Sequence, residues 1–227
     1  EYAENNVVLN AVNMPSMNLE VLSKIQPFIS LCEKMGKFMG QVCKTGVKKI
    51  KVKYHGNVSE NDVKPLTMSA LKGYLTPIMS APVTFVNAPL IAEERGIEIV
   101  ESKDTTLSDF SSLISLDVVT EANSFSLSGS IFGKKEPRFT NFNGHSIDIL
   151  PEGNILMIEN DDKPGVIGLL GNVLGKKDIN INRLYLSNQK DAKKNYALAL
   201  ISVDSSVSED VLEFIANMDE VKSIDQV

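Results

Sequence analysis

The sequence predicts an α+β fold in two domains, an intermediate α/β domain with an antiparallel meander followed by a ferredoxin-like domain. Three observations indicate this. Apolar residues follow helical spacing near the start, alternating runs occupy residues 113–150, and a βαββαβ order fills residues 154–226. Because Pro151-Glu152-Gly153 is a natural linker, we predict three segments, 1–16, 17–152 and 153–227.

The first half of the intermediate domain combines helices with two strands. Apolar spacing predicts a helix over residues 19–42, and Pro27 inside it favours either a kink or two consecutive helices. The other expected elements are a strand at 47–54, a helix from Asp62 to about Ser80, a helix at 87–95 and a strand at 97–101.

The second half of the intermediate domain reads as strands. A polar loop at residues 102–112 leads into three alternating runs, 113–121, 124–132 and 138–150. Turn residues separate or interrupt these runs, and Asn143-Gly144 is the strongest short hairpin signal among them. This pattern predicts the antiparallel meander.

The last domain has the ferredoxin-like order of elements. We predict strand 154–159, helix 164–176, strand 179–188, strand 195–203, helix 208–217 and strand 221–226.

Bulk properties narrow the class of protein. A formal net charge of -6 over 227 residues argues against a nucleic-acid binder. No apolar run reaches the roughly 18 residues that span a membrane, and no signal peptide is seen. Cys32 and Cys43 lie in one predicted helix, about 16 Å apart along its axis, which excludes a mutual disulfide. We expect two buried thiols, a reducing cytoplasmic compartment, and, because the sequence starts at Glu1, a longer parent protein.

The turn Asn160-Asp161-Asp162-Lys163-Pro164-Gly165 is the first candidate binding site. It crowds amide, carboxylate and ammonium groups at a helix N-terminus, where free N–H groups attract a carboxylate and an Asp can hold an ammonium. Asn160, Asp162 and Asn180 could together hold a small zwitterion. Asp162 as a simple helix N-cap is the competing interpretation.

Glycines recur along the following helix, at Gly165, Gly168, Gly171 and Gly175. Their spacing is not that of a nucleotide-binding loop. Each interior glycine costs about 1 kcal/mol of helix stability relative to alanine, so the series favours close packing of this helix against a sheet or a partner.

A second candidate site is an anion site built from basic residues. Lys49, Lys51 and Lys53 alternate on one strand, which is typical of a solvated face. Lys134, Lys135 and Arg138 follow the second meander strand, and Arg138 is the best candidate for bidentate recognition of an anionic metabolite.

Residues of the kinds used in catalysis are sparse. The two histidines, His55 and His145, have no potential metal ligands at suitable spacing, so no metal site is predicted. No nucleophile elbow or catalytic Cys-His pairing stands out. We therefore predict no catalytic residue in this chain.

Several motifs together resemble the C-terminal half of long-form bacterial D-3-phosphoglycerate dehydrogenases. The run ENDDKPGVIGLLG at 159–171 with Ile179-Asn180-Ile181 is similar to an amino-acid-sensing ACT domain. The motifs AVNMPS, TFVNAP, GSIFG and NGHSIDILPEG precede it at 11–16, 84–89, 129–133 and 143–153. The resemblance implies the tail of a substrate-binding domain at 1–16, an allosteric-substrate-binding domain and an ACT domain.

The resemblance also implies a function. The family oxidises 3-phosphoglycerate with NAD in serine biosynthesis, as a homotetramer inhibited by L-serine. Its catalytic and NAD-binding domains would precede residue 1, so this fragment would hold no cofactor. Serine would lie between paired ACT domains of a homodimer or homotetramer, held by Asn160 and Asp162 of one subunit and Asn180 of the other, with Lys163, Pro164 and Gly165 completing the turn.

Two alternatives remain open at this point. Iron–sulfur L-serine dehydratases use related intermediate and ACT-like domains, although two non-clustered cysteines make a poor cluster ligand set. The chain could also be an oligomerisation module that does not sense serine. An anionic metabolite such as 3-phosphoglycerate is a further expected partner, whereas nucleic acid and membrane are not.

Overall fold

The computed structural model describes residues 19–43, 46–106, 109–133, 135–188 and 196–227. The predicted tail at 1–16 therefore lies outside the described residues. The chain divides into two compact units, Glu1–Arg138 and Phe139–Val227. This division falls inside a strand of the first sheet, whereas that sheet ends at Ile149 and the next begins at Asn154. A domain boundary at residue 152 stays a prediction.

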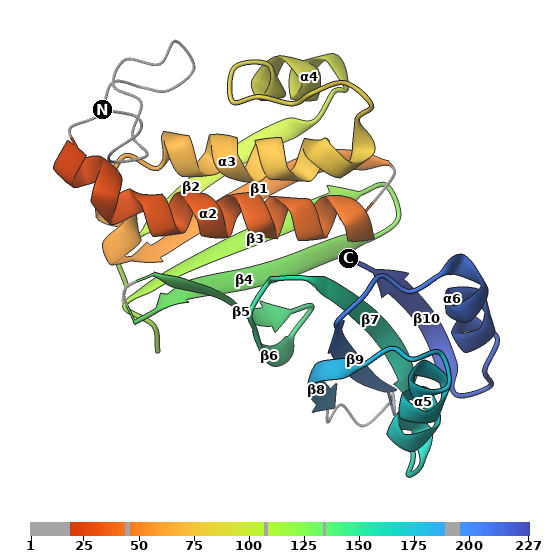
Figure 1. Cartoon of the computed structure of the whole chain (residues 1–227). Helices are drawn as coiled ribbons and strands as arrows, with labels where there is room; N and C mark the ends of the chain where they lie inside the picture. The colour runs from red at the N-terminus through yellow and green to blue at the C-terminus, as the bar shows by residue number, and fades with distance from the viewer. Residues whose placement is uncertain (1–18, 44–45, 107–108, 134, 189–195) are drawn as a thin grey trace, which may run out of the picture. The chain divides into compact units, whose positions relative to one another are not determined.

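A six-stranded sheet covered by helices dominates the first part of the chain (Figure 1). Its strand order is β2-β1-β3-β4-β5-β6; β1 and β2 are parallel, and β3 to β6 form the predicted meander. The elements are α2 Leu19–Val42, β1 Val47–Gly56, η1 Asn57–Glu60, α3 Lys64–Leu75, η2 Thr76–Ile78, α4 Ala88–Glu94, β2 Glu98–Asp104, β3 Ser112–Thr120, β4 Ser124–Phe132, β5 Glu136–Phe142 and β6 His145–Ile149.

Strand β1 shows the predicted two-sided pattern. Ile50, Val52 and Tyr54 are each at most 1% exposed and belong to the core. On the other face, the Lys49 ammonium lies 2.8 Å from the Glu98 carboxylate. The alternation of the sequence thus separates core from solvent-facing side chains.

Three predicted elements differ in extent. Helix α2 is one helix containing Pro27, so two consecutive helices at this point are wrong. Helix α3 ends at Leu75 rather than near Ser80, because Pro77 lacks the N–H donor that would continue the helical hydrogen bonds, and the 3-10 turn η2 follows. The polar loop begins later than predicted, since Ser102 pairs with β1 and β2 runs to Asp104.

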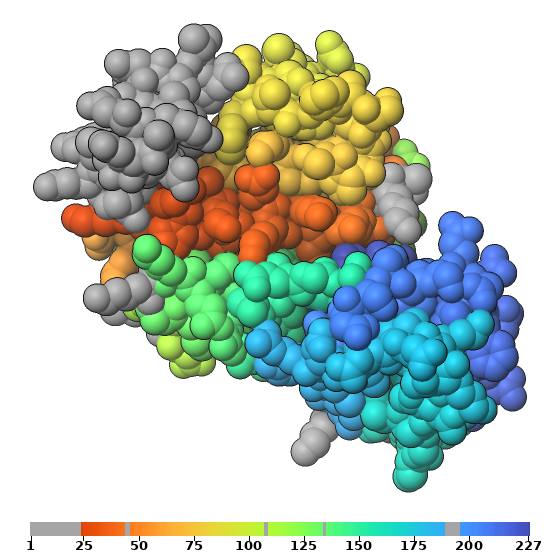
Figure 2. All heavy atoms as spheres, in the orientation of Figure 1, coloured from red at the N-terminus to blue at the C-terminus, as the bar shows by residue number. Residues whose placement is uncertain are grey.

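Helices α2 and α3 pack with their backbones in contact. A Cβ atom added at Gly36 would overlap the carbonyl oxygen of Ala70 and lie 2.7 Å from the amide nitrogen of Tyr74. At Gly73 an added Cβ would overlap the carbonyl oxygen of Glu33. Figure 2 shows the orange band of α2 and the gold band of α3 adjoining without a gap. Only glycine permits this approach, and this role of Gly36 and Gly73 was not predicted from the sequence.

The second sheet confirms the ferredoxin-like arrangement. Its strand order, β10-β7-β9-β8, is antiparallel throughout, with α5 and α6 as the two helices. The elements are β7 Asn154–Asp161, α5 Val166–Gly175, β8 Ile181–Asn188, β9 Tyr196–Val203, α6 Glu209–Ala216 and β10 Val221–Gln226.

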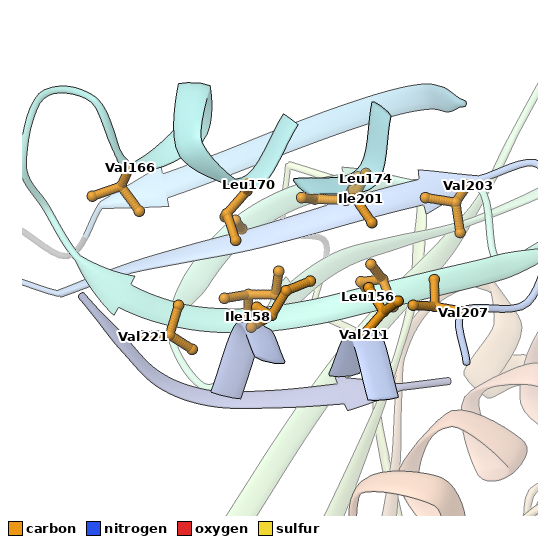
Figure 3. Packing of buried hydrophobic residues seen from close by; sticks show 12 residues of the cluster. Leu156, Ile158, Val166, Leu170, Leu174, Ile201, Val203, Val207, Val211 and Val221 are labelled. Carbon is orange, nitrogen blue, oxygen red and sulfur yellow. The ribbon is translucent and has the colours of Figure 1, made fainter. Parts of the chain in front are cut away.

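The core of the second unit forms between α5, α6 and the sheet. Val166, Leu170 and Leu174 point from α5 toward the strands, where they meet residues such as Ile158 and Ile201 (Figure 3). All five are at most 4% exposed. The spacing of four residues along α5 places these three side chains on one face of the helix.

Both cysteines are free and buried, as predicted. Burial raises the pKa of the Cys32 thiol, which leaves it protonated and unreactive. In the part of the chain that the structure describes, no helix has the length and apolar character required to cross a bilayer.

The close helix crossing generates a stability prediction. We expect Gly73→Ala to lower the free energy of unfolding by about 1–3 kcal/mol, because the added methyl group overlaps backbone that cannot move aside. Lys37→Ala on the exposed face of α2 is the control and should change stability by less than about 0.5 kcal/mol. Urea denaturation followed by circular dichroism measures both. Equal effects would contradict the packing argument.

Candidate functional site

The acidic turn lies where β7 ends and α5 begins. Gly165 occupies the N-cap position with φ 98°, a left-handed conformation that glycine adopts without strain, and makes no side-chain capping bond. Pro164 precedes it in the turn. Asp162 is therefore not the N-cap of α5, and the capping interpretation is wrong. Its carboxylate is exposed and remains available for another role.

Asp161 anchors the turn electrostatically. Its carboxylate lies 2.7 Å from the Lys163 ammonium and 3.1 Å from that of Lys222 on β10. The hydrogen bond from Lys163, followed by that from Lys222, lowers the pKa of Asp161, and the same pairing raises the pKa of Lys163. Lys163 is thereby directed to Asp161. The ion pair between Asp161 and Lys222 links the turn to β10.

Asp162 contacts Asn188, a residue that was not predicted from the sequence. The Asn188 Nδ2 donates to Asp162 Oδ2 at 3.0 Å. Asn188 ends β8, and the ladder explains the contact, because Asn160 pairs with Ala197 and Ala197 pairs with Asn188. No local signal marks Asn188, since its approach to the turn depends on the order of strands in the sheet.

Asn160 is buried, with a relative exposure of 2%, and is only half satisfied. Its Nδ2 donates to the backbone carbonyl of Asp161 at 2.8 Å. Its Oδ1 is buried and has no hydrogen-bond donor among the described residues. Leaving a buried acceptor unpaired costs about 1–3 kcal/mol, so the turn contains an acceptor that a further donor would stabilise.

Asn180 lies at the opposite end of the unit from the turn. It precedes Ile181, which pairs with Val203, and Val203 pairs with Asn154 at the start of β7. The turn follows the other end of β7, about 20 Å away at roughly 3.4 Å per residue. The Asn180 amide N–H donates to Asp204 Oδ1 at 3.1 Å. One chain therefore cannot bring Asn160, Asp162 and Asn180 to a single small ligand.

The glycines of α5 do not pack against their own sheet. A Cβ added at Gly168, Gly171 or Gly175 would meet nothing within 4 Å, so that part of the packing prediction is wrong. These three residues share one flank of the helix at 3.6 residues per turn. On the adjacent edge strand β8, Leu184 and Leu186 are 39% and 48% exposed.

Among the described residues of the predicted anion site, Arg138 is already engaged by neighbouring side chains. The Arg138 guanidinium donates from Nε to Glu136 Oε1 at 2.8 Å, donates from Nη2 to the same oxygen, and lies 5.3 Å from the ring centroid of Phe132. Lys135 is exposed, and Lys134 lies outside the described residues. The anion site stays a prediction, with Glu136 already competing for Arg138.

Over the ranges that the structure describes, no group of three or more His, Cys, Asp or Glu residues is arranged to hold a metal ion.

The ion pairs of Asp161 generate a pH prediction. Since its pKa is lowered on folding, its stabilising contribution is present above the unfolded-state value of about 3.9 and is lost as pH falls through the folded value. We expect Asp161→Asn to be less stable than the wild type near pH 7, with the difference shrinking below about pH 4. Asp219→Asn, at an exposed position, is the control. A pH-independent difference in the unfolding free energy would contradict the ion-pair assignment.

Comparisons with known proteins agree with this architecture. The chain is 28% identical over 224 residues to the D-3-phosphoglycerate dehydrogenase of Bacillus subtilis, covering 99% of this chain and 42% of the relative. The enzymes of the same name from Archaeoglobus fulgidus and Methanocaldococcus jannaschii are 32% and 31% identical, over 94% and 95% of this chain and 40% of each relative. The chain thus spans about 40% of the length of these relatives.

The matching family covers more than half of the chain. Residues 24–143 match the profile of the D-3-phosphoglycerate dehydrogenase intervening domain. This stretch includes most of α2, the strands β1 to β5 and the β5–β6 turn. The chain belongs to the D-3-phosphoglycerate dehydrogenase intervening-domain family, and its relatives continue through the ferredoxin-like unit that carries the acidic turn.

Proposed function

We propose that this chain is the regulatory region of a D-3-phosphoglycerate dehydrogenase and that its ferredoxin-like unit, residues 153–227, is an ACT domain that binds L-serine between two copies. The parent protein would oxidise 3-phosphoglycerate with NAD in serine biosynthesis, in the cytoplasm, as a homodimer or homotetramer. The chain itself would be regulatory rather than catalytic. The relatives' name and the coverage of their length support the parent activity.

The observation that carries the proposal is the separation of Asn180 from the turn. Two copies related by a two-fold axis would pair β8 with β8 in antiparallel fashion. The start of one strand, next to Asn180, then faces the end of the other, where Asn188 holds Asp162. One chain cannot supply all the residues of the site. A symmetric pair would form two equivalent sites, each with the turn of one copy and Asn180 of the other.

The surface beside β8 suits a second copy of the chain. β8 is an edge strand, so one row of its backbone N–H and C=O groups has no partner among the described strands of this sheet. Leu184 and Leu186 are exposed on this edge strand, and Gly168, Gly171 and Gly175 leave one flank of α5 open. We call Leu184, Leu186 and these glycines the apolar strip. The glycines permit close approach of another backbone, which agrees with the predicted packing of α5 against a partner.

The chemistry of the turn fits an amino-acid zwitterion. The exposed Asp162 carboxylate can accept from the ligand ammonium, and the first N–H groups of α5 after Gly165 can hold the ligand carboxylate. The partner's Asn180 amide would contact the ligand from the other side. The unpaired Asn160 Oδ1 provides an acceptor that a ligand donor or an associated water can satisfy.

Regulation would act through a difference in affinity between two conformations. A ligand shifts an equilibrium only as far as it prefers one state. We propose that the linker around Pro151–Asn154 is the element that moves when L-serine joins the ferredoxin-like domains of two copies of the chain.

The serine proposal predicts thermal stabilisation. At about 100 times Kd, L-serine should add roughly 2.7 kcal/mol, which raises Tm by about 5–10 °C for a protein of this size. Asp162→Ala and Asn180→Ala should each abolish most of the shift, because each removes one side of the shared site. Asn172→Ala, exposed on α5, is the matched control and should keep it. Differential scanning calorimetry measures the shift, and an equal response in all variants would refute the assignment.

The shared site also predicts a dimer that depends on the β8 edge. Leu186→Glu should convert the dimer to a monomer and remove the serine response, because it places a charge in the apolar strip. Leu169→Glu is the control, since Leu169 is 43% exposed on the other flank of α5. Light scattering coupled to size-exclusion chromatography measures the mass. A serine response in a monomer would exclude the two-copy site, whereas a dimer without a response would favour an oligomerisation module.

A further inference from the structure

A second concave site lies in the first unit and shares no residue with the acidic turn. The pocket has a volume of about 400 Å³, within the range of small-molecule sites. It lies where β1 begins, beside the end of α3 and the segment that follows α4. Its location follows from the parallel pairing of β1 with β2, which brings Lys49 alongside Glu98 and so gathers the starts of both strands.

The pocket has an apolar side and a cationic side. Val47, Ile78 and Ile97 supply aliphatic surface, whereas Lys48 and Arg95 supply the charges. The described lining contains no carboxylate. An apolar wall with a few convergent polar groups is the usual composition of a metabolite site.

Arg95 is the principal charge of the pocket. Its backbone N–H donates to the Ile91 carbonyl at 3.1 Å, and Gly96 follows with φ 68°, so the chain turns sharply after α4 and holds Arg95 at the rim. Within the described ranges, its guanidinium has no ion pair with a carboxylate. An unpaired guanidinium presents a planar fork of donors that matches a carboxylate.

Two other polar groups support Arg95. The Lys48 ammonium lies 2.8 Å from Glu121, but both side chains are more than 60% exposed, so this pair is weak and readily exchanged. Tyr74 is 1% exposed and donates its hydroxyl proton to the Cys43 carbonyl at 2.8 Å, which fixes its ring in the wall. The positive charge of Arg95 is close enough to oppose the rise in the pKa of Tyr74 that burial causes.

We infer that this pocket binds a small organic carboxylate with an apolar body. Arg95 would receive the carboxylate in bidentate fashion, Lys48 would add a second charge, and Val47, Ile78 and Ile97 would cover the apolar part. Carboxylate binding at this pocket is independent of serine binding, because the pocket residues belong to the first unit and the proposed serine residues to the second.

Benzoate is the probe that tests the pocket, with benzylammonium as a ligand of similar shape and opposite charge. In ¹H–¹⁵N NMR spectra of the whole chain without serine, benzoate should cause saturable shifts at the amides of Gly46, Val47 and Ile97. Arg95→Met should weaken binding at least about tenfold, the loss expected for one charge-assisted interaction. Lys48→Met should weaken it less, and Arg183→Met, at an exposed position on β8, should leave it unchanged.

Three outcomes would overturn the inference. They are the absence of saturable shifts with benzoate, undiminished binding in Arg95→Met, and equal binding of benzylammonium. Because Arg95 is exposed, its replacement should leave the fold intact, and the spectrum of the variant checks this directly. Loss of serine binding in separate experiments would not alter the result at this pocket.

Discussion

The contact between the backbones of α2 and α3 is the constraint on which the first unit depends. Gly36 and Gly73 lie where any side chain would overlap the opposite helix, so the two helices pack in direct backbone contact. That layer covers the buried face of β1, where Ile50, Val52 and Tyr54 lie. The Lys72–Glu33 ion pair, 2.7 Å long, joins the same two helices. The absence of side chains at Gly36 and Gly73 thus sets the distance between the two helices.

In the second unit, the glycines of α5 are not required by tight packing within the chain. On α5 they face open space, and the core is made by Val166, Leu170 and Leu174 on another face of the helix. The strand register places the acidic turn and Asn180 at opposite ends of the sheet. In the proposed serine site, each copy of a symmetric pair would therefore supply one half.

Much of the fold was predictable because its signals are local. Alternation marked the meander, and the hairpin at Asn143-Gly144 has the positive φ values, 49° and 85°, that its turn requires. The βαββαβ order was predicted, and each boundary lies within about two residues of the observed one. The ends of α3 and β2 were predicted wrongly. Pro77 ends α3 early, and the pairing of Ser102 with Lys53 extends β2 into a segment whose polar composition predicted a loop. Helix capping by Asp162 was wrong because Gly165 takes the N-cap position.

The sequence by itself determined the order of elements, the alternating core of each strand and the unusual chemistry of the turn, because periodicity and turn residues act over a few positions. Only the tertiary structure decided which glycines are tightly packed, that Asn188 contacts Asp162, and that Arg138 is occupied by Glu136. It also placed Arg95 beside the apolar wall of a pocket. These features depend on strand order, packing distance and side-chain geometry, which local patterns leave open.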